Sequence, residues 1–208
     1  MIHFVPPTWD LSSLVGVASA QAMDIHVNTL HRGYVNKINQ KFERSGLLEV
    51  PPSVVLSDVS SFISDKNDAQ FYIDNMGGAF AHTLFWQIIN PNRVSQGDPT
   101  LEEIKRQSLD LAKGFVGSGW VWGALSRGNL RVYTARNHNT PFMRKEYPLF
   151  TIDLWEHAYF LDYFASRADW VSNIVDLLDL NKINSYIPHT EQDPMVHPID
   201  NLLLHGKA

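Results

Sequence analysis

The pattern of hydrophobic positions in the first half of the chain has the period of α-helices. Between residues 12 and 46, apolar and aromatic side chains recur at a spacing that lets them share one helix face. Gly46 is expected to end this stretch and to turn the chain. The same kind of periodicity continues over residues 54–64 and 68–89. We therefore predict an N-terminal α-helical hairpin domain over residues 1–90.

A different pattern begins after the turn-rich segment at residues 90–99. Residues 100–103 (TLEE) have the S/T-x-x-E form of a capping box, which predicts that a helix starts there. Three later segments are rich in β-forming side chains that alternate or run apolar, at 120–126, 129–135 and 148–154. These segments predict a helix followed by a small antiparallel sheet.

The remaining elements complete the second domain. Arg127-Gly128-Asn129 suits a tight hairpin between the first two strands. Helices are expected to follow at about 156–166 and 168–180. The chain is therefore assigned to the α+β class. Its C-terminal α/β domain, with a three-stranded antiparallel sheet, is predicted to span residues 99–208.

Composition and charge narrow the class of protein. At 208 residues with 44% hydrophobic side chains, the chain can bury a substantial core. A net charge of -5 argues against a nucleic-acid partner, because such partners select basic surfaces. The absence of cysteine excludes disulfides and thiolate metal sites. No apolar run reaches membrane-spanning length, and residues 14–20 lack the basic flank of a signal peptide, so we expect no membrane contact and a cytoplasmic location.

Three histidines and one aspartate are candidate metal ligands. Asp153 and His157 are four residues apart, so they could share a helix face or straddle a strand end and the next helix start. His26 and His82 lie in aromatic-rich amphipathic segments. Three imidazoles plus one carboxylate suit a first-row transition metal and leave one coordination position for solvent or substrate. Taken singly, each side chain is more commonly a hydrogen-bonded interior residue.

Five sequence blocks around these residues resemble the iron/manganese superoxide dismutases, in family order and with family spacing. The most specific is residues 153–159 (DLWEHAY), which is similar to the family signature D-x-W-E-H-A-Y. The other four blocks are residues 23–36, 77–86 (with HTLFW), 117–122 (GSGWVW) and 137–141 (NHNTP).

The resemblance implies a fold of this kind, superoxide as substrate, and one iron or manganese ion per subunit. The implied reaction is the disproportionation of superoxide to dioxygen and hydrogen peroxide. In it the metal cycles between the +2 and +3 oxidation states. Tyr34 matches the family's gateway tyrosine, which relays protons. The implied metal ligands are His26, His82, Asp153 and His157. The family's aromatic positions around the metal are filled by Trp86, Trp120, Trp122 and Trp155.

The chain departs from the family pattern next to the metal. Manganese-type members place a glutamine where this chain has His138, and iron-type members supply it from the position of Gly78. His138 is therefore expected to take the place of that outer-sphere donor. Thr151 resembles iron-type members, because manganese-type ones carry glycine there. The two departures from the manganese pattern favour iron.

The resemblance also implies a homodimer. The family's Glu of the W-E-H motif reaches the last histidine ligand of the second subunit, which gives Glu156 that role, with Ser118 near the same axis. A histidine–tyrosine pair that many members form across the dimer is replaced here by Leu30 and Phe160. Losing both partners together can be nearly neutral.

Residues 185–208 run past the family's usual end. We expect a loosely packed tail rather than a contact element or a further metal site. Two other functions remain open. One is an inactive scaffold related to the dismutases, which retained ligands and negative charge oppose. The other is a mononuclear iron oxygenase, whose two-histidine, one-carboxylate site needs open positions that a third histidine would fill.

Overall fold

The computed structural model describes residues 1–42, 47, 49–92, 97–188 and 196–206. The turn predicted at Gly46 lies outside these residues. Within them, none of the helices is long and apolar enough to cross a bilayer.

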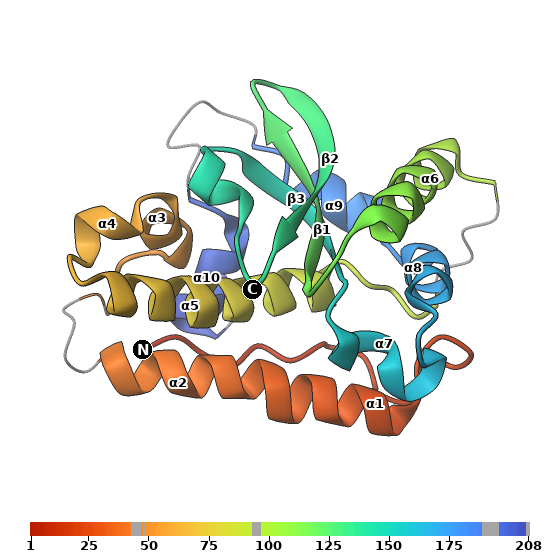
Figure 1. Ribbon diagram of the computed structural model, residues 1–208, viewed down its shortest axis with the longest axis horizontal. Coiled ribbons are helices and arrows are strands. Elements are labelled where there is room, and N and C mark those ends of the chain that lie inside the picture. The colour runs from red at the N-terminus through yellow and green to blue at the C-terminus, as the bar shows by residue number, and fades with distance from the viewer. Residues whose placement is uncertain (43–46, 48, 93–96, 189–195, 207–208) are drawn as a thin grey trace.

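The N-terminal domain is a hairpin of two long helical rods (Figure 1). The first rod is continuous through α1 (Ala20–Asp24), the π-helical segment η1 (Ile25–His31) and α2 (Arg32–Phe42). It runs antiparallel to α5 (Lys66–Gln87). The second half of α5 is buried on all sides, as expected of a helix that is apolar all round. The predicted hairpin is confirmed, although its first helix begins at residue 20 rather than 12.

In the sequence between the two rods, the helix predicted at residues 54–64 is instead two short helices. They are α3 (Pro52–Ser57) and α4 (Val59–Phe62). The break is at Asp58, whose backbone is not helical, with φ -157° and ψ 69°. Its carboxylate accepts hydrogen bonds from the Ser60 and Ser61 hydroxyls. Aspartate commonly competes with helical hydrogen bonds in this way, so the helix restarts after it.

The C-terminal domain opens with α6 (Pro99–Gly114). Its N-cap is Asp98, which accepts from the backbone N–H groups of Thr100 and Leu101. The prediction that Thr100 caps this helix is therefore wrong by two residues. Asp98 precedes a proline, which is well suited to the first helical position, so the Asp-Pro pair starts the helix earlier.

The predicted three-stranded antiparallel sheet is confirmed, and its strands lie in the order β2-β1-β3. β1 (Gly119–Ser126) and β2 (Asn129–Arg136) are joined by Arg127 and Gly128, both with positive φ, as a primed hairpin turn requires. A 3-10 turn, η2 (Pro141–Arg144), leads into β3 (Tyr147–Asp153). The central strand β1 and the third strand β3 are almost wholly buried.

Among the described residues, three helices come next in the sequence after the sheet. They are α7 (Glu156–Tyr163), α8 (Arg167–Val175) and α9 (Leu180–Ser185). The last of the helices predicted from sequence is thus interrupted after residue 175. In Figure 1, α7 lies between the first rod and the sheet, and α6 and α8 lie side by side at the far end of the domain.

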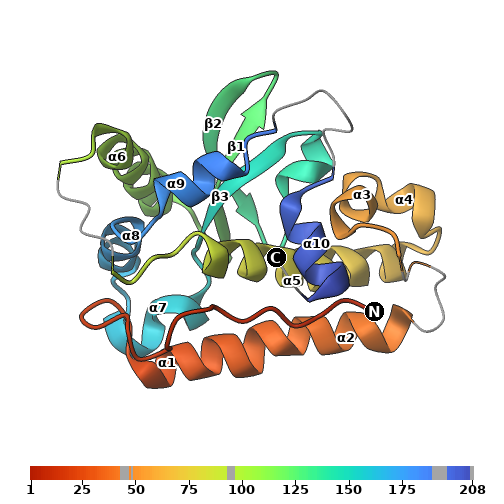
Figure 2. The ribbon, with the colours of Figure 1, turned by 180° about the vertical axis from the view of Figure 1, so that it is seen from behind.

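The C-terminal segment is packed, which corrects the expectation of a loose tail. Residues 198–205 form α10 (Pro198–His205), in which Ile199 and Leu203 are fully buried. Figure 2 shows this helix against α5 and beside α3. The hydrophobic positions Ile199, Leu202 and Leu203 share one face of the helix, and this is the face that is buried. The rest of the tail at 189–195 and 207–208, including His189, lies outside the described residues.

Candidate metal centre

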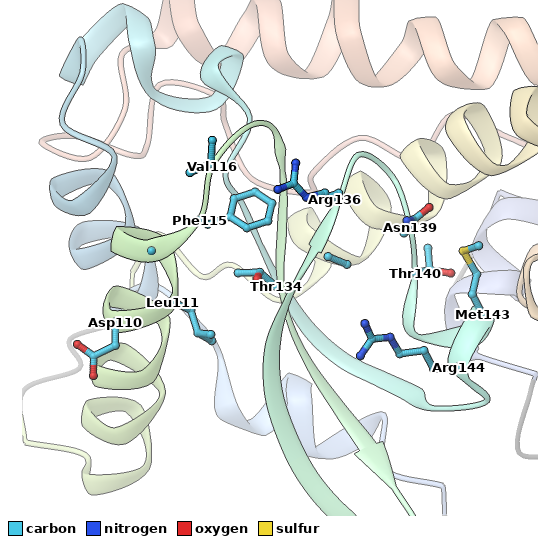
Figure 3. A pocket seen from close by; sticks show the side chains of 12 residues that line it. Asp110, Leu111, Phe115, Val116, Thr134, Arg136, Asn139, Thr140, Met143 and Arg144 are labelled. Carbon is cyan, nitrogen blue, oxygen red and sulfur yellow. The ribbon is translucent and has the colours of Figure 1, made fainter.

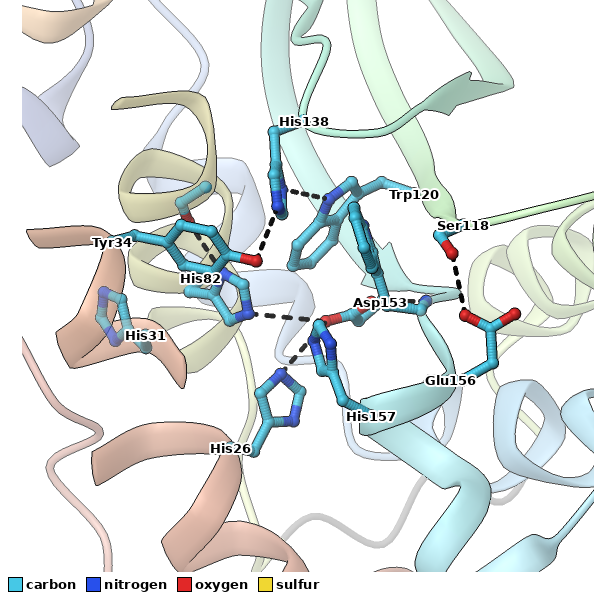
Figure 4. A network of polar contacts seen from close by, with 12 residues as sticks. His26, His31, Tyr34, His82, Ser118, Trp120, His138, Asp153, Glu156 and His157 are labelled. Carbon is cyan, nitrogen blue, oxygen red and sulfur yellow. Dashed lines mark hydrogen bonds and ion pairs between the residues drawn. The ribbon is translucent and has the colours of Figure 1, made fainter. Parts of the chain in front are cut away.

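The four candidate ligands converge where the two domains meet (Figure 4). One ligand atom from each of His26, His82, Asp153 and His157 lies within 4.8 Å of the others. His26 comes from η1 and His82 from α5, whereas Asp153 ends β3 and His157 is in the first turn of α7. Asp153 and His157 therefore straddle a strand end and a helix start, one of the two arrangements that their spacing allowed.

The donor atoms surround a single carboxylate oxygen. Oδ2 of Asp153 lies 3.1 Å from Nε2 of His26, 3.2 Å from Nε2 of His157 and 3.6 Å from Nε2 of His82. The other oxygen, Oδ1, accepts from the Trp155 backbone N–H at 2.8 Å. Nε2 of His82 is buried and makes no hydrogen bond in the described residues. A buried nitrogen without a partner is costly, and a bound cation is the partner that this donor set suits.

Burial keeps two of these histidines in the neutral, ligating form. It lowers the pKa of His26 and holds the pKa of His82 well below its usual range. Burial alone would raise the pKa of Asp153, but the charge of His157 and hydrogen bonds from His157 and His26 hold that pKa below its usual range. His26 and His82 are thus neutral and Asp153 is ionised, which are the forms of these side chains that bind metal.

A hydrogen bond from Nδ1 and a stacked ring fix the orientation of the His82 imidazole. Its Nδ1–H donates to the carbonyl of Gly78 at 2.7 Å, which directs the Nε2 lone pair towards Asp153. The ring of His31 stacks on it, with centroids 5.4 Å apart and planes at 11°. Nδ1 of His31 accepts from the Trp86 indole, so its Nε2–H donates to the Thr83 hydroxyl. A ligand held in this way has one tautomer and one ring orientation.

Two contributors to this arrangement were missed from the sequence. His31 lies within a recognised block, but nothing in its spacing distinguishes a supporting imidazole from a ligand. Trp170 lies on α8, outside every block, and donates its indole N–H to the backbone carbonyl of Asp153 at 2.8 Å. Trp170 also packs in the core, which is the role that an isolated tryptophan suggests.

His138 and Tyr34 are paired beside the ligand cluster. The Trp120 indole donates to Nδ1 of His138 at 3.2 Å. Nε2 of His138 therefore carries the proton and donates to the Tyr34 hydroxyl at 2.9 Å. Burial lowers the pKa of His138 to about 4 and raises the pKa of Tyr34 well above its usual range, so both are neutral at physiological pH. The His138 ring also stacks on Trp155, with centroids 4.8 Å apart.

Two glycines explain why a histidine can occupy this place. A Cβ on Gly77 would lie 2.3 Å from the carbonyl oxygen of His138, and one on Gly78 would lie 2.9 Å from the Tyr34 ring. The loop carrying His138 and the Tyr34 ring therefore approach α5 too closely for any side chain there. A side chain at position 77 would displace the His138 loop, and one at position 78 would displace the Tyr34 ring.

The remaining predicted residues support the sheet and the α7 junction. Thr151 is buried and its hydroxyl donates to the Val121 carbonyl at 3.0 Å. The Trp122 indole donates to the Asn139 carbonyl at 3.2 Å, which holds the loop that follows His138. Trp155 contributes its ring and its backbone N–H rather than its indole N–H, which makes no hydrogen bond in the described residues.

Glu156 points away from the ligand cluster (Figure 4). It accepts a hydrogen bond from the Ser118 hydroxyl at 2.8 Å, and its other oxygen lies 3.7 Å from the Arg167 guanidinium. Its side chain is about half exposed, at 52%. The carboxylate is therefore partly open to solvent.

A separate surface cavity of about 760 Å³ lies between α6, β2 and the turn η2 (Figure 3). Phe115, Arg136, Thr140 and Arg144 are among the residues that line it, and none of the four candidate ligands does. Asn139 and Thr140, which follow His138 in the chain, also line this cavity, but His138 does not. The cavity is therefore separate from the ligand cluster.

Two family models match most of the chain. The alpha-hairpin domain of the iron/manganese superoxide dismutases matches residues 5–90, and the C-terminal domain of the same family matches residues 92–186. The chain belongs to the iron/manganese superoxide dismutase family. All four candidate ligands lie inside the matched residues, with two in each domain. Residues 187–208, which include α10, lie outside both matches.

Proposed function

We propose that this protein is a superoxide dismutase that converts two superoxide ions and two protons into dioxygen and hydrogen peroxide. Its one iron or manganese ion per chain would be held by His26, His82, Asp153 and His157. The metal's chemistry is to accept one electron from one superoxide and return it to the next. The observation that carries the proposal is the set of three imidazole nitrogens around one buried carboxylate oxygen, with Nε2 of His82 unpaired in the described residues.

Tyr34 is proposed as the proton donor to the reduced substrate. Its hydroxyl accepts from Nε2–H of His138, so its own proton is free to point towards an anion beside the cluster. Burial raises its pKa well above the usual range, which keeps the phenol protonated at physiological pH. The chain of bonds behind it ends at the Trp120 indole, which is a donor only. Each proton that Tyr34 gives up is therefore replaced from solvent, which reaches its partly exposed ring.

We favour iron as the metal. His138 replaces the glutamine amide of manganese-type members, and Thr151 replaces their glycine. A group that hydrogen-bonds solvent at the centre changes the potential at which the metal exchanges its electron. The two replacements come from different elements, one in the loop after β2 and the other within β3.

The proposed dimer uses the surface around Glu156. Three apolar side chains on this part of the second domain are exposed, namely Phe160 at 57%, Phe164 at 71% and Val116 at 75%. Exposed aromatic groups beside a half-exposed carboxylate suit an isologous contact with a second copy of the chain. Phe160 would meet the half-buried Leu30 there as an apolar pair.

A dismutase assay of the purified protein tests the proposal directly. We expect iron- or manganese-loaded protein to accelerate superoxide decay in pulse radiolysis in proportion to its concentration. The chelated, metal-free protein should have no effect. An inactive scaffold would instead show no acceleration from either metal-loaded form, and such a result would reject the dismutase proposal.

His138→Gln tests the outer-sphere role. We expect the fold and the bound metal to be retained, while the ratio of iron- to manganese-supported activity changes by several-fold. Because the pKa of His138 is about 4, the activity profile between pH values of about 6 and 9 should keep its shape in the variant. His205→Gln, at an exposed position on α10, is the matched control. Equal ratios in the wild type and His138→Gln would show that His138 does not tune the metal.

A further inference from the structure

The described part of the C-terminal segment, residues 196–206, joins the two domains. On the N-terminal side, the backbone N–H of His3 donates to the Leu203 carbonyl at 2.6 Å, and Ser53 of α3 is bonded to Asp200. In the C-terminal domain, the His197 ring forms a hydrogen bond with the backbone carbonyl of Pro148 in β3. α10 also lies along α5 (Figure 2). This segment comes after residue 186, where the match to the family's C-terminal domain ends, so the family model does not describe these contacts.

His197 makes the contact with β3 and is fully buried at 1% exposure. Its Nδ1 accepts from the backbone N–H of Ile199 at 3.1 Å, so Nε2 carries the proton. That proton is donated to the Pro148 carbonyl at 3.0 Å. The ring also packs edge-on against Phe80 and Phe142, with centroids 5.3 Å and 6.3 Å away.

Asp200 makes the contact with α3. One carboxylate oxygen accepts from the Ser53 backbone N–H at 3.0 Å, and the other accepts from the Ser53 hydroxyl. The second oxygen also accepts from the backbone N–H of His197 at 2.8 Å. One buried carboxylate thus fixes α3, the start of α10 and the residue that reaches β3.

Three of the groups that contact His197 lie a few residues before or after a residue of the metal centre. Phe80 is two residues before His82 on α5, and Pro148 is five residues before Asp153 on β3. Phe142 is four residues after His138 and lies in η2. Each contact therefore holds one end of a short segment. The other end of that segment carries a candidate metal ligand or His138.

We propose that residues 196–206 are a clasp across the two domains and that His197 is a positioning residue for the metal centre. Its hydrogen bond to Pro148 and its ring contacts hold α5, η2 and β3 in one relative position. This holds the donor atoms from the two domains at coordinating distance. The proposal rests on the metal site proposed above. It goes beyond that site because it gives a function to a segment outside the family match.

The test compares His197→Leu with His205→Leu. Leucine at 197 can neither donate to Pro148 nor accept from Ile199, whereas the same change at the exposed position 205 removes no bond that the structure shows among the described residues. Manganese-loaded proteins are challenged with EDTA at a temperature where all remain folded. We expect His197→Leu to lose metal about tenfold faster than the wild type and to shift the visible absorption of the oxidised metal, with His205→Leu unchanged. His197→Gln, whose amide can donate to Pro148, should restore much of the difference.

Two further measurements keep the test decisive. If His197→Leu does not fold, Ser53→Ala removes one bond at the other end of the clasp and should speed metal loss in the same direction. Hydrogen exchange of the metal-free protein should be faster at β3 and η2 in the variant, and this readout does not depend on the dismutase proposal. An unchanged metal-loss rate, spectrum and exchange, with only a lower melting temperature, would show that the tail merely adds stability and would overturn the inference.

Discussion

Replacing Asp153 with asparagine is expected to eliminate both the bound metal and the dismutase activity. The carboxylate is fully buried, and its Oδ2 is the atom that the three histidine nitrogens share. An amide has almost the same shape but no charge to offset that of a metal cation. Groups outside the ligand set are already worth about 10- to 100-fold in metal affinity or activity, so losing a ligand should cost at least ~100-fold.

The metal-free form of this variant separates binding from folding. The amide oxygen of the new side chain can still accept from the Trp155 backbone N–H, as Oδ1 of Asp153 does. The metal-free variant should therefore unfold close to the metal-free wild type in urea. Metal content by mass spectrometry and the superoxide decay rate complete the comparison, with Asp110→Asn on the surface of α6 as control. Full metal occupancy and activity in Asp153→Asn would contradict the assigned ligand set.

Replacing Glu156 with alanine is expected to weaken the dimer and the metal centre together. If Glu156 of one subunit reaches His157 of a second copy, its loss leaves that ligand without an orienting acceptor. Groups that orient a metal ligand in this way are commonly worth about 10- to 100-fold in metal affinity or activity. Within one subunit, the side-chain contacts that the structure describes for Glu156 are those to Ser118 and Arg167, which lie at the surface.

Light scattering and metal competition measure the two effects on the same samples. We expect the wild type to be a dimer, and Glu156→Ala to dissociate at a higher protein concentration and to lose metal faster. Glu102→Ala, an exposed carboxylate on α6, should behave as the wild type. A fully active monomeric wild type, or a variant that loses neither property, would contradict the proposed contact.

The four candidate ligands could be named from the sequence because they lie in short, specific motifs. His26, His82, Asp153 and His157 were named from their blocks, and the structure brings them within 4.8 Å. His138 was placed by counting back from a proline, and its bonds to Trp120 and Tyr34 agree with a role next to the cluster. The helical hairpin and the tight turn at Arg127 and Gly128 likewise follow from period and turn chemistry, which are local properties.

The features that the sequence did not predict depend on contacts between distant residues. Residues 185–208 were expected to be loose because prolines and histidines are typical of exposed tails. Yet Asp200 is bonded to Ser53, 147 residues earlier, and no local pattern indicates that partner. The π-helical form of η1, which carries His26, was not predicted either, because the apolar spacing of residues 12–46 indicates a helix without distinguishing its type.

The central claim is that one redox metal at this cluster supports dismutation. The most direct measurement loads metal-free protein with increasing iron or manganese and records superoxide decay against metal bound per chain. The account predicts activity that rises linearly and stops rising at one metal per chain, with no such rise in Asp153→Asn. Saturation of the site without activity from either metal, or activity that continues without bound metal, would contradict it.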